Sequence, residues 1–73
     1  MTYQDIQDYA DEIASARLGF GVVDEVWSDI KRLFNPSIGE MLAINLMANA
    51  IIASDSGVDI DWDDVTEKCQ SYL

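Results

Sequence analysis

The chain has 73 residues, of which 49% are hydrophobic, with fourteen acidic side chains, four basic ones and no histidine. This length gives one domain, and the hydrophobic content is too high for a disordered chain. The formal charge of −10 disfavours direct binding to DNA, RNA or an anionic membrane, because such binding depends on clustered lysine and arginine. The absence of histidine removes the usual acid–base group at neutral pH and the commonest metal ligand.

The cysteine content and the length of the apolar runs indicate the cellular compartment of the chain. Cys69 is the single cysteine, so an internal disulfide is excluded and a reducing compartment is favoured. Residues 1–12 are polar and acidic, unlike a signal or transit peptide. The longest apolar run, residues 41–53, is shorter than the roughly 20 residues that a bilayer span needs. We therefore expect a cytoplasmic protein without a membrane anchor.

Two helices are predicted in the first half of the chain, over residues 3–17 and 22–34. Thr2 followed by Asp5 is a near match to the capping box that begins a helix. The apolar stripe of the first helix comprises Ile6, Tyr9, Ala10, Ile13 and Ala14. Gly19 is suited to the left-handed conformation of a C-terminal cap. A short strand over residues 18–23 is the alternative for the segment between the helices.

The second predicted helix has a wide apolar face and ends at Asn35-Pro36, because a residue before proline disfavours the helical conformation. Its apolar residues are Val22, Val23, Val26, Trp27, Ile30, Leu33 and Phe34. A third helix is predicted over residues 36–53, with Asn35 as its N-cap and Pro36 in its first turn. It is apolar nearly all round, so we expect it to be the central helix that the others surround.

A fourth helix is predicted over residues 62–72, with Asp61 as its N-cap. Its apolar stripe comprises Trp62, Val65, Cys69 and Leu73. Short helices with tight connections predict an all-α fold, a compact bundle of about four helices around a hydrophobic third one.

Half of the acids have a structural explanation, because anions near a helix N-terminus interact favourably with the helix dipole. The seven at predicted helix starts are Asp5, Asp24, Glu25, Glu40, Asp61, Asp63 and Asp64. The other seven are Asp8, Asp11, Glu12, Asp29, Asp55, Asp59 and Glu67. Asp5, Asp8 and Glu12 share one face of the first helix. The unexplained acids, with Asp5, are either a solvated surface or a phosphate-like row that a basic groove of a partner protein accepts.

The acid-rich segment 55–67 does not fit a calcium-binding EF-hand loop, which needs glycine at position 6 and glutamate at position 12. A loop starting at Asp59 has Asp64 and Gln70 at these positions. A loop starting at Asp55 has Gly57 at position 3, where a ligand is needed, and Thr66 at position 12. We therefore expect no specific metal site, and we interpret residues 55–61 as the loop into the fourth helix.

Ser37 lies near the middle of a small, acidic, four-helix chain and opens a hydrophobic helix. In these features the chain resembles the acyl carrier proteins, in which the serine of an Asp-Ser-Leu motif carries phosphopantetheine. The resemblance implies a carrier module modified at Ser37. Here the triplet is Pro36-Ser37-Ile38, without the acid, and the long loop that precedes the motif in that family is absent. The simpler interpretation is a serine in the first turn of a helix.

Two polar residues interrupt the apolar surface of the third helix, and a cysteine belongs to the apolar stripe of the fourth. Asn45 and Asn49 stand one helical turn apart on the third helix, and they predict a strip that reaches solvent or meets a neighbouring backbone. A polar contact in a self-association seam is the alternative. Cys69 is predicted to be a small core residue, because no histidine is present to activate it as a nucleophile.

These observations predict a non-enzymatic binding protein, without a cofactor, whose acidic surface engages a basic site of a partner protein. In its most concrete form it is an inhibitor that occupies a nucleic-acid-binding surface by imitating phosphates. It is then analogous in size and charge to small acidic viral proteins that block host defence nucleases, anti-CRISPR proteins among them. The alternatives are the Ser37 carrier and an oligomerising subunit, such as a homodimer. Were the acids only a solvated face, the interface would lie on apolar surface at Phe20, Tyr72 and Leu73.

Overall fold

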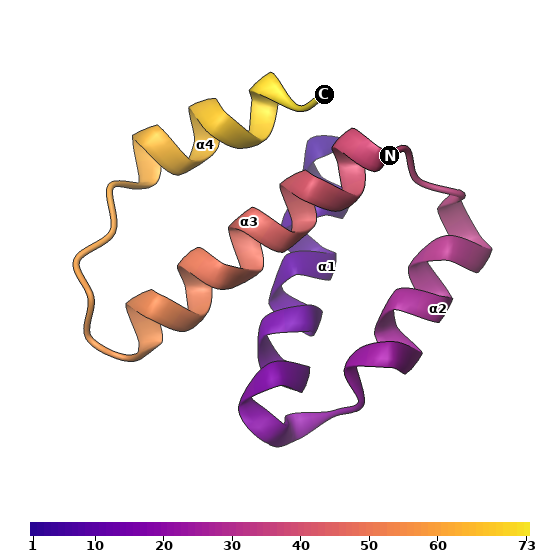
Figure 1. The fold of residues 1–73 in the computed structure, drawn as a ribbon, viewed down its shortest axis with the longest axis horizontal. Helices are drawn as coiled ribbons and strands as arrows, with labels where there is room; N and C mark the ends of the chain where they lie inside the picture. The colour runs from indigo at the N-terminus through magenta and orange to yellow at the C-terminus, as the bar shows by residue number, and fades with distance from the viewer.

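The computed structural model describes residues 1–73, which form four α-helices and no strand. The helices are α1 (Tyr3–Ser15), α2 (Val23–Phe34), α3 (Ile38–Asp55) and α4 (Trp62–Ser71). Helix α3 crosses in front of α1, α4 runs antiparallel beside α3, and α2 lies on the other side, spread away from α3 (Figure 1). The molecule is flattened, with extents of 34 × 29 × 16 Å. The predicted all-α bundle is confirmed, and none of its helices combines the length and apolar character needed to cross a bilayer.

The core lies where α1 crosses α3. Its ten buried residues are Ile6, Ala10, Ile13 and Ala14 from α1, Ala43, Ile44, Met47 and Ala48 from α3, Ile30 from α2 and Cys69 from α4. The predicted stripe of the first helix is therefore confirmed, with Tyr9 packed at its margin. The third helix is central but not surrounded, since Ile38 is 75% exposed and Leu42 is 46% exposed.

Helix α1 begins as the sequence predicts and ends at Ser15, two residues before the predicted end. The Asp5 amide donates to Thr2 Oγ1 at 3.1 Å, and the Thr2 amide donates to Asp5 Oδ2 at 2.9 Å, which completes the capping box. The chain then makes a wide π-type turn over Ala16–Phe20, in which Gly19 has a left-handed φ of +99°. A side chain at such a φ is strained, so glycine suits this position.

The predicted start of the third helix is wrong. Asn35 is the left-handed C-cap of α2, with a φ of +45°, and its amide donates to the Lys31 carbonyl. Asparagine tolerates this conformation better than most residues, and Pro36 has no amide to extend the helix. Ser37 is the N-cap of α3, because Ser37 and Glu40 form a complete capping box that Asn35 cannot form.

The apolar faces of α2 and α4 are only partly buried, which differs from the prediction. Ile30 is the one fully buried residue of α2, whereas Val22 and Leu33 are more than half exposed. On α4, Cys69 is fully buried but Trp62 and Leu73 are 43% and 58% exposed. The flattened shape explains both results, because each of these helices packs against the α1–α3 pair along one side only.

Helix α4 has a local N-cap, and it contacts α3 through a buried thiol and a close backbone approach. Asp61 accepts a hydrogen bond from the Asp64 amide at 3.2 Å, so the predicted N-cap is confirmed. The buried Cys69 Sγ lies 3.5 Å from the Ala43 carbonyl oxygen of α3, as donor to it. Gly39, in the first turn of α3, lies so close to the Tyr72 carbonyl that a Cβ atom there would overlap it.

We predict that Gly39→Ala destabilises the protein by about 1–2 kcal/mol, because the added methyl forces the end of α4 away from α3. The higher helix propensity of alanine offsets less than about 1 kcal/mol of this loss. In a thermal melt followed by circular dichroism, the midpoint should fall by roughly 4–8 °C for each kcal/mol. Gly21→Ala is the control, since its Cβ would make only an ordinary 3.6 Å contact with Ala16. Equal midpoints for wild type and Gly39→Ala would contradict the close packing of α4.

Candidate functional site

Helix starts account for seven acids, as predicted. Asp61 is an N-cap, and the first turns contain Asp5, Asp24, Glu25, Glu40, Asp63 and Asp64. Their charges face the positive ends of the helix dipoles, which stabilises them where they stand.

Three of the remaining acids converge from two helices. Asp11 and Glu12 of α1 and Asp29 of α2 line a hollow of about 360 Å³. Phe20, from the turn between these helices, also lines it and is 84% exposed. We call this site the acidic hollow. It combines carboxylates with a protruding aromatic ring, the pairing of groups that a basic protein surface with an apolar spot can accept.

The acids of α1 extend beyond the acidic hollow. Asp8 and Asp11 line a second hollow of about 380 Å³ on the side towards α4, together with Trp62 and Thr66. Asp11 therefore lies between the two hollows. Asp5 continues the row, but its carboxylate is engaged by the Thr2 amide in the helix cap.

The other candidate acids are not brought to this surface. Asp55 is the last residue of α3, Asp59 lies in the following loop and Glu67 lies on α4. All three are exposed, and none lines either hollow. No group of three or more His, Cys, Asp or Glu side chains is arranged to hold a metal ion. Residues 56–61 form the loop into α4.

Few basic side chains compensate the acids. Arg32 pairs with Asp29 at 3.0 Å, and Lys68 pairs with Asp64 at 3.0 Å. All four side chains are more than half exposed, so solvent screens these pairs and they contribute little. In the acidic hollow, Asp29 has this weak partner, and no basic side chain pairs with Asp11 or Glu12.

Asn45 and Asn49 have a partner that the sequence does not reveal. The Arg17 guanidinium donates to Asn49 Oδ1 at 2.7 Å and to Asn45 Oδ1 at 2.6 Å. The two amides thus hold an arginine of the same chain, where the sequence predicted solvent or a neighbouring backbone. This contact fastens the end of α1 to the middle of α3.

An apolar groove between α2 and α3 was also missed. It measures about 430 Å³ and is lined by Trp27, Lys31, Ile38, Met41, Leu42 and Asn45. We call it the α2–α3 groove. It exists because α2 packs on α1 and spreads away from α3, an arrangement that no local pattern in the sequence predicts.

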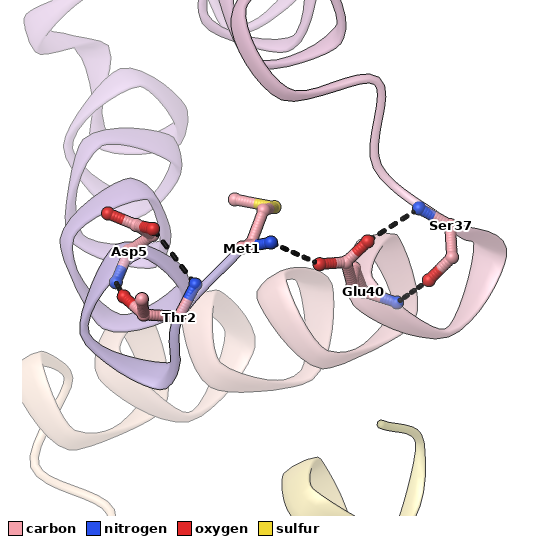
Figure 2. A network of polar contacts seen from close by, with 5 residues as sticks. All are labelled: Met1, Thr2, Asp5, Ser37 and Glu40. Atoms are coloured by element: carbon pink, nitrogen blue, oxygen red, sulfur yellow. Dashed lines mark hydrogen bonds and ion pairs between the residues drawn. The ribbon is translucent and has the colours of Figure 1, made fainter.

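Ser37, the candidate attachment site of a carrier group, takes part in a network that begins α3 (Figure 2). Its Oγ accepts from the Glu40 amide at 3.1 Å, and its own amide donates to Glu40 Oε1 at 2.8 Å. The Met1 ammonium lies 3.0 Å from Glu40 Oε2. The Ser37 amide first and the ammonium second lower the pKa of Glu40.

Cys69 is a core residue, as predicted. It is fully buried, and its burial raises the pKa of the thiol. A raised pKa reduces the thiolate fraction at neutral pH and with it the reactivity towards electrophiles.

Comparison of the chain with protein-family models, with curated proteins and with solved structures gave no match in any of the three. The surface chemistry of the chain is therefore the basis for a functional proposal.

We predict that Glu40→Gln lowers stability at neutral pH by about 1 kcal/mol, since partly exposed charge-assisted hydrogen bonds contribute at the low end of their range. The pKa of Glu40 in the folded protein lies below its ordinary 4.5. Its contribution is therefore complete above pH 4.5 and is lost as the pH falls through the lowered value. Urea unfolding should show a gap between wild type and variant at pH 7 that closes in acid. Asp59→Asn is the control, and a gap independent of pH would contradict the assignment.

Proposed function

We propose that this chain is a non-enzymatic binding protein whose acidic α1–α2 surface occupies a basic site on a partner protein. The most specific form of this proposal is an inhibitor that covers a nucleic-acid-binding surface. The observation that carries it is the convergence of Asp11, Glu12 and Asp29 on the acidic hollow beside the exposed Phe20.

The charge density of α1 supports an imitation of phosphates. Four acids lie between Asp5 and Glu12, a distance of about 10 Å along a helix that rises 1.5 Å per residue. The average spacing is one charge per roughly 3.5 Å, close to the 3.4 Å per charge along one strand of duplex DNA, with the four acids spread over about a third of the helix circumference. A groove of lysines and arginines spaced for a nucleic-acid strand would therefore meet a similar row of anions.

Phe20 supplies the apolar component that a purely electrostatic surface lacks. Exposed charges steer association and determine which partner is accepted, but buried aromatic anchors contribute most of the binding energy. At 84% exposure, the Phe20 ring is available for such burial. Because Phe20 lines the acidic hollow, a partner that binds there would contact both the aromatic ring and the carboxylates.

We predict that a triple variant, Asp11→Asn, Glu12→Gln and Asp29→Asn, remains folded but loses the partner. The three side chains are exposed, so neutralising them removes repulsion without opening the core. Immobilised wild type and variant would be incubated with the same lysate, and the retained proteins quantified by mass spectrometry. Salt should release the proteins that wild type alone retains, because screening shortens the range of the charges to about 8 Å at physiological ionic strength. The released proteins should bind DNA or RNA in competition with this chain.

The matched control is Asp55→Asn, Asp59→Asn and Glu67→Gln, which removes the same charge away from both hollows. It should retain the partners of wild type. If both triple variants lose them equally, net charge and not the acidic hollow is responsible. If the first variant retains them at all salt concentrations, the acids are only a solvated face and the proposal fails.

A further inference from the structure

Of the two basic side chains without an acidic partner, one lines the α2–α3 groove and the other is hydrogen-bonded to a residue that lines it. Lys31 lines the groove and makes no hydrogen bond or ion pair within the chain. Arg17 donates only to the neutral amides of Asn45 and Asn49, and Asn45 also lines the groove. In a chain with fourteen acids and four basic residues, the lining of this groove contains a basic side chain and no acidic one.

The rest of the groove is apolar and accessible. Ile38 is 75% exposed and Leu42 is 46% exposed, one helical turn apart on α3. Trp27 and Met41 line the groove with them and are partly buried. An aromatic ring and a flexible methionine beside exposed aliphatic groups resemble the surfaces that receive the apolar face of a helix.

We propose that the α2–α3 groove binds an amphipathic helix of another protein, one that carries acidic residues beside its apolar stripe. Leucine-like side chains of this helix would pack on Ile38, Leu42 and Trp27. Its carboxylates would pair with Lys31, which lines the groove. This goes beyond the proposed function, because the acidic hollow receives a basic surface and the groove receives an acidic one.

The charges favour such a helix over a second copy of this chain. A symmetric dimer through the groove packs one groove lining on the other, and neither lining contains a carboxylate to neutralise Lys31. An acidic helix with an apolar stripe supplies the carboxylate that Lys31 lacks.

The test uses two synthetic helical peptides with the same leucine stripe, one flanked by glutamates and the other by lysines. The full chain carries Trp62→Phe, so that the emission reports Trp27 alone. Titration at low salt should show binding of the glutamate peptide with a Kd about tenfold lower than that of the lysine peptide. Lys31→Glu should reverse this preference. Leu42→Glu should abolish binding, and Val58→Ser, an exposed residue of the loop before α4 that lines neither the groove nor the hollows, should leave it unchanged.

Three results would overturn the proposal. The first is that neither peptide changes the Trp27 emission up to millimolar concentration. The second is that both peptides bind equally, or that Lys31→Glu leaves their order unchanged. The third is that sedimentation shows a dimer of the wild type that Leu42→Glu dissociates, which would assign the groove to a second copy.

Discussion

The crossing of α1 over α3 is the constraint on which the rest of the molecule depends. These two helices supply eight of the ten core residues, and four of the eight are the alanines Ala10, Ala14, Ala43 and Ala48. Small side chains let the helices approach closely, but each buries little apolar area, so hydrophobic burial alone gives a modest stabilisation. Local interactions that hold the helix ends are therefore a large part of what keeps this short chain folded.

The same crossing decides where the flanking helices lie. Helix α2 contributes Ile30 to the core, and Phe34 meets Tyr9 of α1 edge-on, with ring centroids 5.4 Å apart. Helix α4 contributes Cys69 and lies with its end against Gly39 of α3. Each flanking helix thus has one firm line of attachment. The surfaces that face away from these lines stay open, and they include both hollows beside α1 and the α2–α3 groove.

The features that the sequence predicts correctly are local ones. The capping box of Thr2 and Asp5, the left-handed Gly19 and the cap at Asp61 each depend on residues within one turn of one another. The N-cap of the third helix was wrongly assigned to Asn35 because two local signals lie close together. Pro36 and the Ser37–Glu40 box both mark a helix start, but only the box supplies two hydrogen bonds.

What the sequence does not predict depends on tertiary placement. Arg17 meets Asn45 and Asn49 across separations of 28 and 32 residues. The convergence of Asp11 and Glu12 with Asp29 likewise requires the angle between α1 and α2. Periodicity places a residue on a face of its own helix, but it contains no information on which faces of different helices meet. The site residues were therefore recognised by their charge, and their grouping came from the fold.

Helix α2 separates two surfaces of opposite character. Asp29 lines the acidic hollow on one side of it, and Lys31 lines the groove on the other. Residues two apart on a helix do not face one another, so these opposite charges do not neutralise each other. No residue lines both surfaces, and a ligand in one leaves the lining of the other free. The attachment of α2 to α1 through Ile30 and Phe34 thus has two consequences, since it closes one side of the core and keeps both surfaces apart.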